Sequence, residues 1–496
     1  MDKKLFAAAS LLVIVATVLA ACAPAPAAPA PAAEKVIVKE TVAVPVEVTK
    51  VVQQTVLAPT ATPAKDRVQI YWYIGLGAGA QPAQIPVEKD WVDKYNKSQN
   101  EIQLIPIIVD NKYAGDNLTA QLAAGNAPDI VGPVGAEGRA AFPGAFADLT
   151  PLVKEANYDL GDVDPAFTKF FVEEGKMVGL PFAIYPSALF VNKDLFKEAK
   201  LDLPPQKVGD KYTLDGKQVD WDWDAVLAVA KKLTVDKNGN DATSAKFDPK
   251  NIVQYGFKMQ WVDDNPRWFA TYWGAAMPVD DKGNAVIPDN WKVGMKWYYD
   301  AIWKYHVVPS QAADSGDLLK GNAFSSGKVA MGLTHTWYTC CIDPKIVPNW
   351  DLAIVPSYQG KITAKMHADT FSIMKDSKHP KEAFKVYQYM LGAGSADLYK
   401  IYGALPARVS QQAAFWAGLD KTYAPNKANW QVMISMIPFM DIPNHQAGLG
   451  VNNNKANAAF TKFGSDIKSN DKLDMDKRIT DFVAELDKIL KEKPAQ

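Results

Sequence analysis

Residues 113–132 read YAGDNLTAQLAAGNAPDIVG and place a helix, its stop signal and a strand next to one another. Gly125 and Asn126 are residue types that commonly follow the last turn of a helix, and Pro128 cannot continue one. Ile130 and Val131 then favour a strand. The stretch therefore predicts a helix that is followed at once by a short strand.

The segments before this stretch show the same alternation. Residues 66–75 (DRVQIYWYIG) alternate apolar with polar side chains and end at Gly, which is typical of a strand. Residues 85–99 carry apolar residues at helical spacing, and residues 101–110 (EIQLIPIIVD) form a second strand. Strands that alternate with helices predict a mainly parallel α/β sheet, which binds small ligands at the carboxyl ends of its strands. The loops at those ends are 73–79, 110–113 and 132–139.

The pattern continues through the rest of the chain. Pro380 near the start of one apolar-periodic segment favours a helix that begins there. The further helices expected are 221–234, 290–306, 379–392 and 479–493, and the further strands are 328–337, ending at Trp337, and 349–358.

The composition describes a large globular protein behind an unusual N-terminus. From about Asp66 onward the chain is longer than one ordinary domain, so we expect two lobes or more. The formal net charge is −1 and there is no basic block, which argues against a nucleic-acid partner.

The N-terminus predicts export. Lys3 and Lys4 precede the apolar run 5–19, which is short for a membrane span and is followed by small residues and Cys22. This arrangement resembles the lipobox of bacterial lipoproteins, which implies a signal peptide over 1–21 and a lipidated Cys22 as a membrane anchor. A plain secretory signal and an N-terminal membrane helix are the alternatives. Residues 22–65, rich in Pro, Ala and Val, are expected to form a linker that carries the folded part outside the cytoplasm.

The globular part resembles a known family. An ordered set of stretches across nearly all of residues 66–493 is similar to the bacterial extracellular solute-binding proteins of the maltose-binding-protein type, the receptors of ABC importers. Each stretch alone is weak evidence, but the ordered set is specific. The stretches are LTAQLAAGNAPDIV (118–131), FADLTPLV (146–153), GKMVGLPFAIYPSALFVNKDLFKEAKLDLPP (175–205), WDWDAVLAVAKKLT (221–234), AFSSGKVAMGLTHTW (323–337), DLAIVPS (351–357), FSIMKDSKHPKEAFKVYQYM (371–390) and GALPARVS (403–410).

This resemblance implies a periplasmic-binding-protein-like α/β fold with two lobes, hinge crossings and a ligand cleft between the lobes. It implies a monomeric receptor, not an enzyme and without cofactor or metal, that closes on a small polar solute and delivers it to an ABC permease. The crossings are expected near LPFAIYPSALF, AIVPS and GALPAR, with lobe 1 at 66–183 plus 356–405 and lobe 2 at 187–352 plus 406–496.

Strand ends and the resemblance together select the candidate ligand-binding residues. Alternation along the first strand predicts that one of Trp72 and Tyr73 lies in the core and the other in the cleft. Asp263 and Asp264 would accept hydrogen bonds from ligand hydroxyls or cap the following helix. Arg408 would contact ligand or form a surface ion pair. The full set is Trp72, Tyr73, Glu137, Arg139, Tyr185, Ser187, Gln260, Trp261, Asp263, Asp264, Trp337, Arg408, Asn444 and His445.

Aromatic residues favour a carbohydrate as the ligand. The chain has 14 Trp, whose faces pack well on a pyranose ring. However, small residues follow PDIV, where only Glu137 and Arg139 remain polar, and residues 442–454 replace an expected aromatic stretch with Asn444, His445 and other polar residues. A peptide, a polyol phosphate or another polar solute therefore stays open as the ligand.

An enzyme and a surface adhesin are the two alternative function classes. A glycosidase needs two carboxylates across the scissile bond, and Asp263 or Asp264 with Glu137 would supply them. No G-x-S-x-G, H-E-x-x-H or P-loop motif supports an enzyme. A surface adhesin that holds a glycan polymer in the same cleft is the other alternative.

Cys340 and Cys341 are neighbours in THTWYTCCID (334–343). An exported chain permits disulfides, but adjacent Cα atoms lie about 3.8 Å apart, whereas disulfides usually span about 4.4–6.8 Å. Two cysteines are too few for a structural zinc site. A vicinal disulfide and two free thiols both stay open, and a bridge would stiffen the loop after Trp337 and hold its indole toward the ligand.

Overall fold

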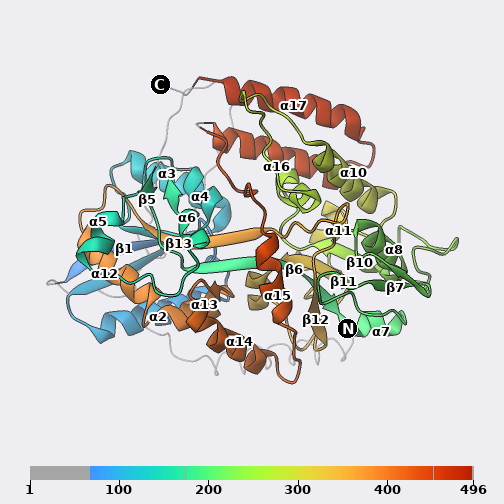
Figure 1. Cartoon of the computed structure of the whole chain (residues 1–496), viewed down its shortest axis with the longest axis horizontal. Coiled ribbons are helices and arrows are strands. Elements are labelled where there is room, and N and C mark those ends of the chain that lie inside the picture. The colour runs from blue at the N-terminus through green and yellow to red at the C-terminus, as the bar shows by residue number, and fades with distance from the viewer. Residues whose placement is uncertain (1–66, 174, 451, 494–496) are drawn as a thin grey trace, which may run out of the picture. The chain divides into compact units, whose positions relative to one another are not determined.

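The computed structural model describes residues 67–173, 175–450 and 452–493 (Figure 1). The signal peptide, the lipidated Cys22 and the linker up to residue 65 lie outside the described residues. Within the described part, no helix is long and apolar enough to cross a membrane.

One ten-stranded sheet organises the described chain. Its main path runs β2-β1-β3-β13-β6-β11-β10-β9, and β12 and β14 also pair with β6. β1 is parallel to β2 and β3, and β10 is parallel to β11, whereas β6 is antiparallel to each of its partners. The strands are β1 (Val68–Ile74), β2 (Ile102–Ile108), β3 (Ile130–Val134), β6 (Ala183–Asn192), β9 (Val235–Asp236), β10 (Ile252–Met259), β11 (Val329–His335), β12 (Trp350–Ala353), β13 (Met366–Ile373) and β14 (Leu405–Pro406).

The central strand β6 belongs to two regions of this sheet. All ten of its residues are buried. Its first half, from Ala183 to Pro186, pairs with β13 and, over Ala183 and Ile184, with β14, and its second half, from Ser187 to Asn192, pairs with β11 and β12. β6 therefore joins the region around β1, β3 and β13 to the region around β10 and β11.

Helices pack against both regions of the sheet (Figure 1). α2 contacts β2, α12 contacts β13, and α8 contacts β10, while α16 and α17 pack on each other. The helices are α2 (Ile85–Ser98), α3 (Asn111–Ala123), α4 (Ala136–Ala140), α5 (Thr150–Glu155), α6 (Pro165–Lys169), α7 (Lys193–Glu198), α8 (Trp223–Leu233), α9 (Pro266–Ala270), α10 (Asp289–Trp303), α11 (Gln311–Ser315), α12 (Pro380–Leu391), α13 (Ser395–Tyr402), α14 (Val409–Tyr423), α15 (Gln431–Met436), α16 (Asn453–Ser469) and α17 (Met475–Lys491). Short 3₁₀ helices are η1 (Thr271–Trp273), η2 (Thr336–Cys340) and η3 (Ile437–Phe439), and two hairpins are β4–β5 (Val172–Glu173, Lys176–Met177) and β7–β8 (Tyr212–Leu214, Lys217–Val219).

The α/β class and the strand–helix alternation of the N-terminal region are confirmed. α3 ends at Ala123, and Gly125 follows it in the left-handed conformation with φ 72°, as a helix stop requires. The strand expected to end at Trp337 ends at His335 instead, because the chain turns into η2 there. Of the strands of the ten-stranded sheet, β6, β9, β10, β13 and β14 were not predicted.

Aromatic packing around Phe190 stabilises the middle of the sheet. The ring of this β6 residue is fully buried and lies 5.6 Å, centroid to centroid, from the rings of both Tyr338 and Trp350. Phe324 contacts the same ring at 6.1 Å. These contacts join β6 to η2, to β12 and to the segment before β11.

We predict that Phe190→Ala lowers the free energy of unfolding by about 3–5 kcal/mol, because it leaves a cavity among these rings. Phe190→Leu keeps most of the volume and should lose about half as much or less. Guanidinium unfolding of both variants measures this difference. A loss below about 1 kcal/mol for the alanine variant would show that β6 is not tightly packed at this point.

Candidate functional site

Strand register brings four polar side chains together on one face of the sheet. Tyr185 and Ser187 share a face because alternate residues of a strand do so. The register pairs Tyr185 with His367 of β13, and Ser187 with His335 of β11. Directly opposed residues of antiparallel strands share a face, so the four side chains meet where the two sheet regions join.

Segments outside the strands add further polar groups around this point. Lys365 precedes β13, Trp337 lies in η2, and the loop between η3 and α16 supplies Asp441 and His445. The whole set is largely buried, although Glu137, Trp337 and His367 keep partial exposure. We call it the central polar cluster: Glu137, Tyr185, Ser187, Arg267, Tyr272, His335, Trp337, Lys365, His367, Asp369, Asp441 and His445.

Three imidazoles and one indole form a continuous column in this cluster. The His335 ring stacks on the Trp337 ring with centroids 4.2 Å apart. The His367 ring lies edge-on to both, at 4.5 and 4.6 Å, and its Nε2 is 3.0 Å from Nε2 of His445. Burial, together with positive charge nearby, lowers the pKa of all three histidines well below the usual value, so the imidazoles are neutral at neutral pH.

Asp441 organises the polar loop beside this column. Its carboxylate accepts hydrogen bonds from the backbone N–H of Met366 at 2.8 Å and of His445 at 2.7 Å, and Nδ1 of His445 lies 2.7 Å from it. Burial raises the pKa of Asp441 to about 7 despite these bonds. The neighbouring Lys365 ammonium has its pKa lowered to about 7, again chiefly by burial. Asp441 thus fixes the loop against the start of β13.

Many buried polar atoms in and around the cluster lack a hydrogen-bond partner among the described residues. Leaving such a group unpaired costs about 1–3 kcal/mol, and folded proteins contain few of them. Water or a solute could supply the partners of the atoms that gather here. The atoms are Nζ of Lys365, Nε of Arg267, Nε2 of Gln260, Oγ1 of Thr271, Thr334 and Thr336, Oγ of Ser187, the hydroxyl oxygens of Tyr185 and Tyr272, and both ring nitrogens of His335.

Apolar ring faces lie beside these polar atoms. The Trp337 ring packs against Tyr185 at 5.6 Å and remains partly exposed. Trp261 is 38 % exposed and adopts a φ of 60°, which is unusual for a bulky side chain. Its Nε1 donates to the carbonyl of Gly321 at 2.8 Å, and its ring meets Tyr338 edge-on at 5.2 Å. These rings offer flat surfaces next to unpaired donors.

The structure brings together part of the predicted site. Tyr185, Ser187, Trp337, Glu137 and His445 all belong to the central polar cluster. Asn444 adjoins it, donating from Nδ2 to the carbonyl of Met366 at 2.9 Å, and Gln260 and Trp261 follow the end of β10.

Three other predicted site residues, Trp72, Tyr73 and Arg139, are buried and bond to other parts of the chain. Trp72 and Tyr73 are both 0 % exposed, and they donate to the carbonyls of Gly132 and Ala114, respectively, at 2.7 Å. Arg139 is buried and pairs with Glu173 at 2.9 Å. The prediction that only one of Trp72 and Tyr73 lies in the core fails, because helices cover both faces of this sheet region.

Asp263 also has a structural partner set. Its carboxylate pairs with Lys258 at 2.5 Å, accepts from the Tyr298 hydroxyl at 2.7 Å and lies 3.7 Å from Lys468. These cations lower the pKa of Asp263 against the effect of burial. Its side chain is therefore held by the protein itself.

Asp264 and Arg408 also contact other parts of the chain. Asp264 pairs with Lys468. The cap of the following helix is Asn265, whose side chain accepts from the backbone N–H of Arg267, so neither aspartate has the capping role. The guanidinium of Arg408 donates to the carbonyl of Asp159 at 2.6 Å.

The sequence prediction missed several members of the cluster. Lys365, His367 and Asp369 occupy every second position of KMHAD, a polar face of period two that predicts a strand with one polar side. Asp441 and Arg267 carry no such local signal, because only the tertiary structure brings them to the cluster.

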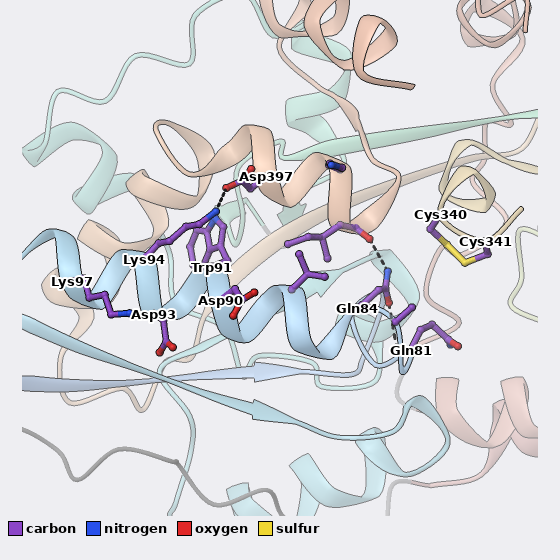
Figure 2. A pocket seen from close by; sticks show the side chains of 14 residues that line it. Gln81, Gln84, Asp90, Trp91, Asp93, Lys94, Lys97, Cys340, Cys341 and Asp397 are labelled. Carbon is purple, nitrogen blue, oxygen red and sulfur yellow. Dashed lines mark hydrogen bonds and ion pairs between the residues drawn. A yellow bond between two sulfur atoms is a disulfide. The ribbon is translucent and has the colours of Figure 1, made fainter. Parts of the chain in front are cut away.

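A separate pocket of about 580 Å³ lies between α2 and α13 (Figure 2). A disulfide between Cys340 and Cys341, with an Sγ–Sγ distance of 2.00 Å, closes one end of it. Lys94 and Asp397 across the pocket pair at 3.2 Å, and Nε2 of Gln84 donates to the carbonyl of Ile401 at 2.9 Å. None of the residues that line this pocket belongs to the central polar cluster.

The disulfide terminates the segment that carries Trp337. The backbone N–H of Cys341 donates to the carbonyl of Tyr338 at 3.0 Å, and Asn322 donates to the carbonyl of Cys341 at 3.1 Å. The Thr339 hydroxyl donates to the carbonyl of Thr336 at 2.8 Å. The turn after β11 is thus fixed at several points around the indole.

Comparison with known proteins gives a consistent family. Residues 78–397 match the model of the family described as bacterial extracellular solute-binding protein. An uncharacterized lipoprotein in the oleD 5' region of Streptomyces antibioticus is 24 % identical over 319 residues, which cover 63 % of this chain. The match spans 64 % of that relative's length.

Solved structures share the fold. An ABC substrate-binding protein of Listeria monocytogenes in complex with cycloalternan superposes with a TM-score of 0.68 at 19 % identity, covering 86 % of this chain and 100 % of that one. The GacH receptor of Streptomyces glaucescens, solved unliganded and with acarbose, gives a TM-score of 0.61 at 17 % identity, covering 86 % and 99 %. These likenesses establish a two-lobed α/β fold of the maltose-binding-protein type.

We predict that the chain from Ala23 onward, exported and then unfolded without reductant, contains no free thiols, because Cys340 and Cys341 are bridged. Reduction should release two. Titration with a chromogenic disulfide measures both states, and a Cys340→Ser/Cys341→Ser variant gives the blank. Two free thiols before reduction would contradict the bridge.

Proposed function

Because the chain belongs to the bacterial extracellular solute-binding protein family, we propose that it captures a sugar or oligosaccharide at the central polar cluster and delivers it to an ABC permease. One observation carries the placement of the site: unpaired donors gather beside the partly exposed residue Trp337. A pyranose presents an apolar face to such a ring and hydroxyl groups to such donors.

The position of the cluster suits capture by closure. Its members come from both sheet regions that β6 joins, and from the loops between them. A solute that contacts both regions binds the closed arrangement better than an open one, and only such a difference drives closure. We therefore assign the hinge to β6 and the neighbouring chain crossings, with the lobe boundaries near residues 183–187, 352–356 and 405–406.

The remaining parts of the proposal concern the membrane. A lipidated Cys22 would hold the receptor outside the cytoplasm beside its permease, and residues 23–65 would give it reach. The relative from Streptomyces antibioticus, itself described as a lipoprotein, supports this placement. The receptor would act as a monomer without cofactor and without turnover of the solute.

We predict saturable binding of at least one member of an oligosaccharide panel to the chain from Ala23 onward. Trp337→Ala should weaken that binding at least about tenfold, because a buried aromatic anchor contributes about 1.4 kcal/mol or more. Calorimetry measures both affinities. Tyr71→Ala, which removes an exposed aromatic on β1 outside the cluster, should bind as the wild type does.

Two outcomes would contradict the proposal. Release of shortened sugars during incubation would make the protein an enzyme. Absence of saturable binding to any small solute, together with no ligand carried through purification by mass spectrometry, would exclude an importer receptor.

A further inference from the structure

Two buried cations of the central polar cluster lack a full set of partners. Lys365 is 0 % exposed, and its Nζ forms no hydrogen bond or ion pair with the described residues. Arg267 is 1 % exposed, and its Nη2 donates to the carbonyl of Ala447 at 2.7 Å, while its Nε has no partner. The carboxylates of Glu137 and Asp441 act electrostatically on both cations, which places the two cations in one neighbourhood.

Two aromatic rings flank the Lys365 ammonium without accepting a hydrogen bond from it. The Nζ atom lies 5.6 Å from the ring centroid of Tyr272 and 5.9 Å from that of Trp268. Ring faces attract a cation but leave its N–H groups free to donate. These ring contacts therefore leave the N–H groups of Lys365 available.

The carboxylates of the cluster differ from its two cations in their hydrogen bonding. Asp441 already accepts two backbone hydrogen bonds, and Oε2 of Glu137 accepts a hydrogen bond from Nε2 of Gln446 at 3.5 Å. No carboxylate oxygen of Glu137, Asp369 or Asp441 is both buried and without a partner. Both cations therefore keep unsatisfied N–H donors, whereas no buried oxygen of these three carboxylates is without a partner.

This imbalance selects the chemistry of the missing partner. A buried unpaired charge is far less favourable than a buried unpaired hydroxyl, and a counter-charge with hydrogen-bond acceptors relieves it best. A neutral sugar offers hydroxyl groups only, whereas a carboxylate or phosphate offers both negative charge and several acceptor oxygens.

We propose that the solute is an anionic saccharide, a uronic-acid or phosphorylated sugar, whose acidic group pairs with Lys365 and Arg267 while its ring packs on Trp337. This inference rests on the proposed function and specifies the substrate class of the same site. The threonine hydroxyls Thr271, Thr334 and Thr336, which also lack partners, are available to the sugar hydroxyls.

The titration behaviour of the cluster agrees with this assignment. Burial lowers the pKa of Arg267 only to about 10, so it stays charged at neutral pH. Burial raises the pKa of Glu137, Asp369 and Asp441 to about 7, which weakens their competition with an incoming anion. Contact with an anion would also keep Lys365 protonated.

Matched pairs of solutes test the proposal with the wild-type chain from Ala23 onward. One arm compares di- and trigalacturonate with galactobiose and galactotriose, and the other compares glucose 6-phosphate with glucose, all by calorimetry in chloride buffer. We expect a member of at least one acidic set to bind at least about tenfold tighter than its neutral counterpart, as charge-assisted hydrogen bonds of about 1.5–3 kcal/mol imply. The arm that responds distinguishes a carboxylate from a phosphate.

Lys365→Met tests the residue. It should abolish the preference for the acidic member and raise the melting temperature of the ligand-free protein, because it removes an unpaired buried charge. Lys112→Met is the matched control, since Lys112 also lies over an aromatic ring, Tyr113 at 5.3 Å, but at the surface of α3. It should leave both quantities unchanged.

The outcomes separate this inference from the proposed function. Neutral sugars that bind as tightly as their acidic partners would overturn the inference and leave the sugar receptor intact. A wild-type preference for the acidic member that survives in a folded Lys365→Met variant would overturn the assignment to Lys365. No binding of any saccharide in either arm would overturn the inference, and the proposed function would fall with it only if no other small solute bound saturably and no ligand was carried through purification.

Discussion

The rest of the structure depends on a single strand that is shared by two sheet regions. All ten residues of β6 are buried, and the strand changes partners at Pro186–Ser187, from β13 to β11. A strand with both faces covered has to be apolar along most of its length, and Ala183–Asn192 is. Tyr185 and Ser187, the two polar side chains near the change of partners, therefore mark the point where apolar core packing gives way to a polar cluster. The proposed hinge and the proposed binding site are consequently parts of one segment.

The sequence predicts the N-terminal part of the sheet better than its centre. Local periodicity suffices for β1, α2, β2 and α3, because each buries its own apolar stripe against an immediate neighbour. It does not predict β6, and Tyr185 and Ser187 were selected because the family resemblance implies a chain crossing there. It does not decide between Trp72 and Tyr73, because a sheet covered on both faces buries both.

Residues distant in the sequence account for the other differences between the prediction and the structure. The sequence predicts that Asp263 contacts the ligand. In the structure, Lys468 of the distant α16 and Lys258 of β10 balance the charge of its carboxylate. This ion network ties the C-terminal helices to the segment that carries Trp261 and Arg267. No local pattern around residue 263 reveals the lysine that α16 contributes.

The unpaired groups of the central polar cluster tie stability to function. If each unpaired buried donor costs about 1–3 kcal/mol, several of them destabilise the closed, empty arrangement by an amount comparable with the net stability of a domain. Opening toward water relieves that cost, because water supplies the missing partners. A solute that supplies them instead restores the closed arrangement, and only a solute with the matching acceptors does so fully. The same unsatisfied atoms, Nζ of Lys365 foremost, would therefore keep the empty receptor open and make its closure selective.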